Sequence, residues 1–145
     1  MPQLPKEIKI LIMGLPGSGK TYLAERLSKH LNCAWFNADA IRKMANDWEF
    51  SENARIRQAN RMRNLADFEK SYGRPVICDF VCPTNHTRNI FQADYIIWMN
   101  TIDSGRFADT NKIFETPLNA RFIINKFLTD AEIRSLSNKL TGADL

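Results

Sequence analysis

The amino-acid sequence predicts an α/β fold with three layers, in which a parallel five-stranded sheet is flanked by helices on both faces. Apolar, β-rich segments alternate with amphipathic segments through most of the 145 residues, which is the order that produces a parallel sheet. The first apolar segment runs directly into a glycine-rich turn that opens a helical segment. No apolar run approaches the roughly 18 residues that a membrane helix needs.

Length and composition limit the classes of protein that the chain can encode. With 44% hydrophobic and 25% charged residues, we expect residues 1–145 to form a single globular domain. The short apolar stretch near the N-terminus leads straight into a functional motif and is no signal peptide, so we expect a cytoplasmic protein without a membrane partner. The net charge of +4 fits an anionic ligand. The three cysteines lack the spacing of a zinc site, so we expect reduced, buried thiols.

Five segments have the composition of strands. The first reads EIKILIM and is β-rich and mostly apolar, as expected for a buried strand of a parallel sheet. Ligands of such sheets bind at the C-terminal ends of the strands, so the residues that follow each segment are candidates for function. The predicted strands are Glu7–Met13, Cys33–Ala38, Pro75–Val81, Tyr95–Asn100 and Arg121–Asn125.

Helical segments connect these strands. Asp39 is interpreted as the N-cap of a short helix, since its carboxylate can accept from free backbone N–H groups. Gly73 ends the longest helix, and Thr129 with Glu132 forms a capping box for the last one. The polar residues 103–116 read as a loop or lid. The predicted helices are Lys20–Leu31, Asp39–Asn46, Ser51–Tyr72, Thr84–Phe91 and Thr129–Leu140.

The turn after the first strand matches the phosphate-binding motif G-x-x-x-x-G-K-[ST]. Its glycines let backbone N–H groups point at a polyphosphate, at the positive end of a helix. Lys20 then supplies a charge for the β- and γ-phosphates, and the Thr21 hydroxyl is a ligand for Mg²⁺. The motif predicts ATP and Mg²⁺ as cofactors and a P-loop kinase fold. Its residues are Gly14, Leu15, Pro16, Gly17, Ser18, Gly19, Lys20 and Thr21.

Three further charged residues lie in or shortly after predicted strands. Asp79 ends the run PVICD and is interpreted as a second magnesium-linked and catalytic group; a surface or capping aspartate is the alternative. Asp39 could orient or deprotonate an acceptor hydroxyl, or serve as the helix cap alone. Arg42 could hold an anionic group of the acceptor, or be a solvated surface charge.

The long helix contributes two more candidates. On a helical wheel Arg55 lies within the apolar arc, so its charge needs a partner, either an anionic acceptor or an internal salt bridge. Arg57 and Arg61 lie near the opposite side and are expected to be solvated. Phe50 precedes the helix and could stack on a nucleobase, with core packing as the alternative.

These motifs, taken in order, resemble those of the adenylylsulfate (APS) kinases. That family shows G-L-x-G-[SA]-G-K-[ST], D-G-D-N-x-R, N-x-D-L-G-F-S-x-x-D-R-x-E-N-x-R-R and F-I-S-P. This chain shows GLPGSGKT, NADAIR, NDWEFSENARIRQANR and FVCP, and its lid region reads RFADTNKIF. The resemblance implies phosphorylation of the 3′-hydroxyl of APS, a small nucleotide acceptor. The substrate-binding residues that it implies are Asp39, Arg42, Phe50, Arg55, Gln58, Val81 and Lys112, with Arg106 and Lys112 closing over the phosphates.

The chain also departs from the family pattern. Asn37 replaces the first acidic residue of D-G-D, which weakens a two-carboxylate base. Ala54, Gln58 and Cys82 replace an aspartate, an asparagine and a serine, and Asp79 is not part of the usual pattern.

Three readings therefore stay open: an APS kinase, a P-loop kinase for a polynucleotide 5′-end or a nucleoside, and a nucleotide-binding protein without phosphoryl transfer. Nucleic acid is a partner only under the second, and a homodimer is compatible with all three.

Overall fold

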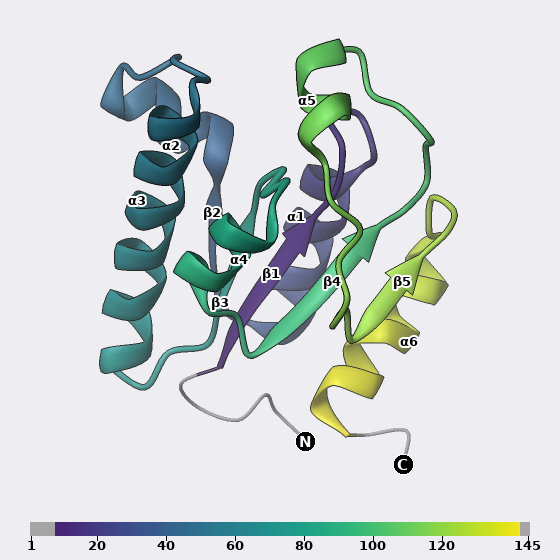
Figure 1. Ribbon diagram of the computed structural model, residues 1–145. Coiled ribbons are helices and arrows are strands. Elements are labelled where there is room, and N and C mark those ends of the chain that lie inside the picture. The colour runs from purple at the N-terminus through teal and green to yellow at the C-terminus, as the bar shows by residue number, and fades with distance from the viewer. Residues whose placement is uncertain (1–7, 143–145) are drawn as a thin grey trace.

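The computed structural model describes residues 8–142, and they contain a five-stranded, entirely parallel sheet (Figure 1). The strand order is β2-β3-β1-β4-β5, so β1 and the motif that follows it lie at the centre of the sheet. This arrangement confirms the predicted fold class. The strands are β1 (Lys9–Met13), β2 (Ala34–Asn37), β3 (Val76–Asp79), β4 (Tyr95–Met99) and β5 (Phe122–Ile124).

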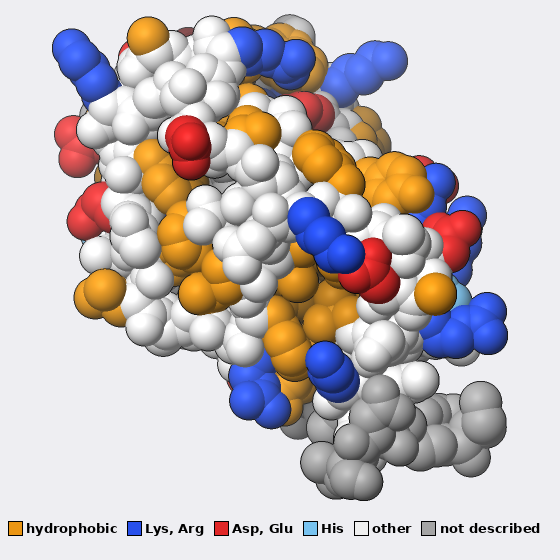
Figure 2. All heavy atoms as spheres, turned by 90° about the vertical axis from the view of Figure 1, so that its right-hand side faces the viewer, with side chains coloured by type: hydrophobic (Ala, Val, Ile, Leu, Met, Phe, Trp, Pro, Cys, Tyr) orange, Lys and Arg blue, Asp and Glu red, His pale blue; other side chains and the backbone are white. Residues whose placement is uncertain are grey.

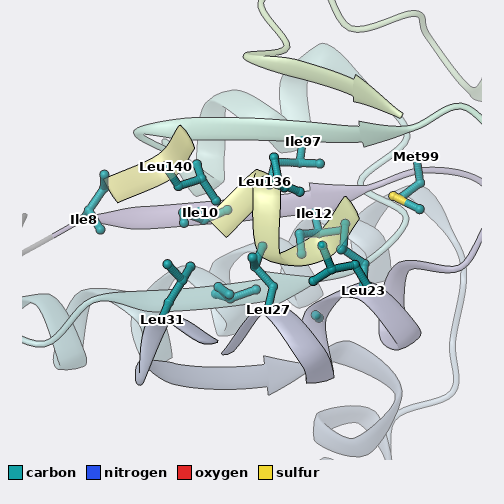
Figure 3. Close-up of a cluster of buried hydrophobic side chains, with 13 residues drawn as sticks. Ile8, Ile10, Ile12, Leu23, Leu27, Leu31, Ile97, Met99, Leu136 and Leu140 are labelled. Carbon is teal, nitrogen blue, oxygen red and sulfur yellow. The ribbon is translucent and has the colours of Figure 1, made fainter. Parts of the chain in front are cut away.

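Helices cover both faces of the sheet, and the side chains of β1 divide the core between them. Ile10 and Ile12 pack with α1 (Lys20–Leu31) and α6 (Asp130–Thr141), and Figure 3 shows these side chains meeting the leucines of both helices. Leu11 and Met13 point to the other face, where they pack with α3 (Glu52–Ser71) and α4 (Asn85–Phe91). This alternation along a strand buried on both sides explains the apolar run 10–13 of β1.

The predicted Thr129 capping box is confirmed at the start of α6, and the predicted Asp39 cap is wrong. At the start of α3, Ser51 accepts from the Ala54 amide. The short helix α2 (Ala38–Ala45) is capped by Asn37, whose side chain accepts from the Ala40 amide, and not by Asp39. Asp39 instead lies inside the first turn of α2, where its side chain is free to face the cavity described below.

The segment 103–116 is not irregular throughout. It contains a short helix, α5 (Ala108–Ile113), that the sequence analysis missed. The Asn111 side chain, within this helix, both accepts at 2.8 Å from the amide of Gly105, which precedes the helix, and donates to the Gly105 carbonyl at 2.9 Å. This reciprocal pair closes the segment into a compact turn above the P-loop. The predicted strand residue Glu7 lies outside the described residues.

The surface on the β5 side carries exposed hydrophobic side chains among lysines and arginines (Figure 2). β5 is one of the two edge strands of the sheet, and Ile123 on it and Phe127 just after it are both about half exposed. None of the helices within residues 8–142 is long and apolar enough to span a membrane.

Candidate functional site

Backbone geometry shapes the P-loop between β1 and α1. Gly19 has φ +98°, and a Cβ built there would come within 2.7 Å of the Phe127 ring, so only glycine fits at this position. The Ser18 hydroxyl is buried and has no hydrogen-bond partner among the described residues. A buried polar group without a partner is costly, which is consistent with a loop shaped to receive a polar ligand.

Lys20 begins α1 and turns back over the loop. Its Nζ donates to the Leu15 carbonyl at 3.0 Å, which places the ammonium group at the positive end of the helix. Burial lowers the Lys20 pKa to about 8, although the nearby carboxylates of Asp79 and Asp39 oppose this shift. A buried cation has lost part of its hydration, and an anionic ligand bound at the helix N-terminus would compensate for that loss.

Asp79 ends β3 beside the P-loop, and its carboxylate is buried. The Trp35 indole N–H donates to Oδ2 at 2.7 Å, and the Asn37 amide donates to Oδ1 at 2.8 Å. The Thr21 hydroxyl lies 3.5 Å from the same Oδ1. Burial raises the Asp79 pKa, while the two donors and Lys20 act in the opposite direction. The alternative of a surface or capping aspartate is therefore wrong.

The Thr21 hydroxyl and the Asp79 carboxylate are hard oxygen donors, which is the chemistry that Mg²⁺ requires. Within residues 8–142 no cluster of three or more His, Cys, Asp or Glu side chains could hold a metal by itself. These two oxygens fit a magnesium ion whose other ligands are water and phosphate oxygens, as is usual in phosphoryl-transfer sites.

A cavity of about 750 Å³ joins the P-loop to the predicted acceptor side. It brings together the three predicted catalytic residues, which come from α1, α2 and β3. Lys112 on α5 is not among its lining residues and is exposed, in contrast to the predicted contact with substrate. The cavity is lined by the predicted site residues Pro16, Gly17, Gly19, Lys20, Thr21, Asp39, Arg42, Phe50, Arg55, Gln58, Asp79, Val81 and Arg106.

Arg42 is buried rather than solvated, so the surface-charge alternative is wrong. Its Nη1 donates to the carbonyls of Asp47 and Glu49 at 2.9 and 3.0 Å, and its guanidinium lies over the Phe50 ring at 4.4 Å. Arg42 therefore holds the loop before α3 and supports the Phe50 ring. That ring is 51% exposed and lines the cavity, which excludes core packing as its main role.

Arg55 has internal partners in this structure. Its Nε donates to the Phe50 carbonyl at 2.9 Å, and its Nη2 lies 3.3 Å from the Thr110 hydroxyl. Nη2 also forms a salt bridge with Asp109 on α5 at 3.5 Å. The alternative of an internal salt bridge is therefore confirmed, and the partner, Asp109, belongs to the predicted lid. The Arg55 side chain also lines the cavity.

Asp47 binds two arginines of α3, and the sequence analysis did not predict this role. Its carboxylate accepts from Arg57 at 2.8 and 3.0 Å and from Arg61 at 2.9 Å. The Arg57 side chain is 47% exposed, as expected for a solvated charge, whereas Arg61 is only 25% exposed, in contrast to the expectation. These hydrogen bonds lower the Asp47 pKa well below its ordinary value. The i, i+4 spacing of the two arginines opposite an acidic loop residue was the available signal.

Gln58 is satisfied from within the chain. Its Nε2 donates to the Ala38 carbonyl at 3.2 Å, and its Oε1 accepts from Arg61. The residue is buried, so its amide joins α3 to the start of α2 rather than pointing free into the cavity. Arg106 is exposed at the cavity rim, where it can approach a bound phosphate.

Comparisons with known proteins identify the family and the fold of the chain. Residues 10–105 match a family model described as AAA domain, and no curated protein sequence matches significantly. An APS kinase from Mycobacterium tuberculosis, solved with AMPPNP and APS, is 16% identical over 94% of this chain and 98% of its own, with a TM-score of 0.79.

Kinases with other acceptors share the fold as well. A gluconokinase from Sinorhizobium meliloti is 14% identical over 97% of this chain and 94% of its own, with a TM-score of 0.67. A shikimate kinase from Aquifex aeolicus is 15% identical over 94% and 98%, with a TM-score of 0.66. At such low sequence identity, structural similarity establishes the fold of the chain but does not identify its acceptor. Since the family model spans more than half of the sequence, the chain belongs to the AAA domain family and has a P-loop kinase fold.

Proposed function

We propose that this protein is a kinase that uses Mg·ATP to phosphorylate a hydroxyl group of a small acceptor, with APS as the leading candidate. The observation that carries the proposal is the convergence of Lys20, Asp39 and Asp79 in one cavity, next to the P-loop. Phosphoryl transfer depends mainly on positioning and charge neutralisation, and this constellation supplies both.

Each residue has a distinct role in the proposed reaction. The P-loop amides and Lys20 bind the β- and γ-phosphates, and Thr21 with Asp79 would hold Mg²⁺, which neutralises charge on the phosphates when bound. Asp39 accepts the proton of the acceptor hydroxyl, whose oxygen attacks the γ-phosphorus. The bond from that phosphorus to the bridging oxygen breaks, and ADP leaves.

Two features of the cavity support a nucleotide as acceptor. Phe50 presents a half-exposed ring to the cavity, with the Arg42 guanidinium over it at 4.4 Å, and the ring can stack on a planar base. Arg55 lies beside that ring with a cationic group for a phosphosulfate. In the APS-bound M. tuberculosis kinase, a protein of the same fold accommodates this acceptor.

A second candidate is the 5′-hydroxyl of a polynucleotide. It is favoured by Asp79, which ends β3 in contact with the P-loop although the APS kinase pattern has no such residue. An Asp-x-x-Arg after the second strand, here Asp39 and Arg42, together with a strand that ends in aspartate, also occurs in polynucleotide kinases.

An ADP-release assay with Mg·ATP tests both candidates against APS, nucleosides and 5′-hydroxyl oligonucleotides. APS-dependent release alone would support the first candidate, and release with oligonucleotides would select the second. The KM for an oligonucleotide should rise steeply with salt because counterions are released, and the KM for APS should rise far less. Tight ATP binding without turnover of any acceptor would refute phosphoryl transfer.

A further inference from the structure

The two oxygens of Asp79 are held by two side chains from the neighbouring strand. Trp35 and Asn37 lie two residues apart on β2, so their side chains leave the same face of the sheet. Asn37 is paired directly with Asp79 in the parallel register of β2 and β3. One donor therefore reaches Oδ2 and the other reaches Oδ1, as the distances of 2.7 and 2.8 Å show.

Asn37 also forms hydrogen bonds at the N-terminal ends of two helices. Its Oδ1 accepts from the Ala40 amide at 2.9 Å and so caps α2, while its Nδ2 lies 3.1 Å from the Thr21 hydroxyl at the start of α1. A single amide thus joins α1, α2 and the end of β3. The asparagine that replaces the first acidic residue of the D-G-D pattern thus has hydrogen-bonding partners of its own.

The chemistry at position 37 requires an amide. An aspartate there could still cap α2, but it would place a second carboxylate against Asp79 in a buried site with no N–H to donate. Two like charges at hydrogen-bond distance repel each other strongly, and one of them would have to take up a proton. Asparagine provides the acceptor for the helix and the donor for Asp79 in one side chain.

We propose that Trp35 and Asn37 are positioning residues for the magnesium site, acting through Asp79. Their N–H groups fix the orientation of the buried carboxylate before a metal arrives, and they leave its remaining lone pairs available on the side of Thr21. Outer-sphere donors of this kind commonly set the affinity and geometry of a metal site. The inference rests on the proposed Mg·nucleotide binding, and it adds to that binding two residues that hold the carboxylate of Asp79.

The experiment measures the coupling between metal and nucleotide rather than activity. ADP affinity is determined by calorimetry in Mg²⁺ and again in EDTA, and the ratio of the two affinities reports the metal contribution. Trp35→Phe removes the indole N–H and keeps an aromatic ring. Asn37→Ser replaces the amide N–H that reaches Asp79 with a shorter side chain, whose hydroxyl can still cap α2. Trp98→Phe is the matched control, since Trp98 is a half-buried strand residue stacked on Phe114, away from Asp79.

We expect the affinity ratio to fall about tenfold in Trp35→Phe and in Asn37→Ser, with ADP affinity in EDTA unchanged. Trp98→Phe should keep the wild-type ratio. A wild-type ratio in both test variants would overturn the inference and leave the proposed function intact. Equal losses of affinity with and without Mg²⁺ would also overturn it, because the two residues would then be merely structural. Absence of ADP binding in the wild-type protein would instead refute the proposed function.

Discussion

Arg55 on α3 and Asp109 on α5 form a salt bridge of 3.5 Å between the predicted acceptor side and the lid. The Arg55 side chain is only 12% exposed, whereas Asp109 is 75% exposed. The lid is thus tied to α3 through the guanidinium that an anionic acceptor would use. Acceptor and Asp109 should therefore compete for one cation.

Neutralising the lid partner should favour an anionic acceptor. We expect Asp109→Asn to lower the KM for APS about threefold, since a partly exposed ion pair contributes little free energy. Arg55→Ala should raise this KM more than tenfold and leave ADP affinity unchanged, because it removes a charge-assisted contact. Steady-state kinetics and calorimetry measure the two effects. Asp103→Asn, a neutralisation elsewhere in the same segment, is the control. If Arg55→Ala weakens ADP binding and acceptor use equally, Arg55 does not belong to the acceptor pocket.

Asp39 should be needed for turnover and dispensable for ATP binding. Asp39→Asn preserves the size of the side chain and removes its ability to take a proton, so kcat should fall about 100-fold to 1000-fold. Calorimetry should show an unchanged affinity for ADP with Mg²⁺. The exposed Asp130→Asn serves as the control for the loss of one carboxylate. Full activity in Asp39→Asn would show that Asp39 does not accept the proton of the acceptor hydroxyl.

The Asp47 cluster should stabilise the loop that carries Phe50. Asp47→Asn removes the charge that holds Arg57 and Arg61, so we expect Tm to fall by about 5 °C at pH 7. A carboxyl whose pKa is lowered by folding contributes stability above its ordinary pKa of about 4 and loses it as the pH falls further. The difference in Tm between Asp47→Asn and wild type should therefore shrink at pH 3.

The exposed Glu49→Gln is the matched control for this measurement and should change Tm little. An equal shift in both variants, or a difference that persists unchanged in acid, would contradict the role assigned to the Asp47 cluster.

The three free thiols should be unreactive in the native protein. Burial raises the pKa of Cys33 and of Cys82 to about 12 and raises that of Cys78 as well. At pH 8 the thiolate fraction of a group with pKa 12 is about 1000-fold lower than that of an ordinary thiol with pKa 9. Mass spectrometry after iodoacetamide treatment at pH 8 should show labelling only in urea. Rapid native labelling of Cys82 would show that this residue is not buried as described.

The order of apolar strands, amphipathic helices and the glycine-rich turn was enough to predict the three-layer parallel sheet. These signals are local, because each depends on the period of side chains along one element or on a motif of consecutive residues. The Ser51 cap and the Thr129 capping box were predictable for the same reason. The helix in residues 108–113 was missed because a segment of six residues is too short to show a clear helical period of apolar side chains.

The tertiary structure decided which polar side chains meet. In the sequence, Asn37 is only a replacement for the first acidic residue of the D-G-D pattern. The pairing of β2 with β3 shows that its amide donates to Asp79. Likewise, Arg55 was correctly singled out by its place on the helix, but its partner Asp109 lies 54 positions further along the chain. Partners of charged and amide groups are set by distances across the fold, which neither periodicity nor local spacing records. The sequence alone could therefore establish the phosphate-binding loop and the fold, whereas the hydrogen bonds that orient its catalytic candidates depended on the assembled sheet.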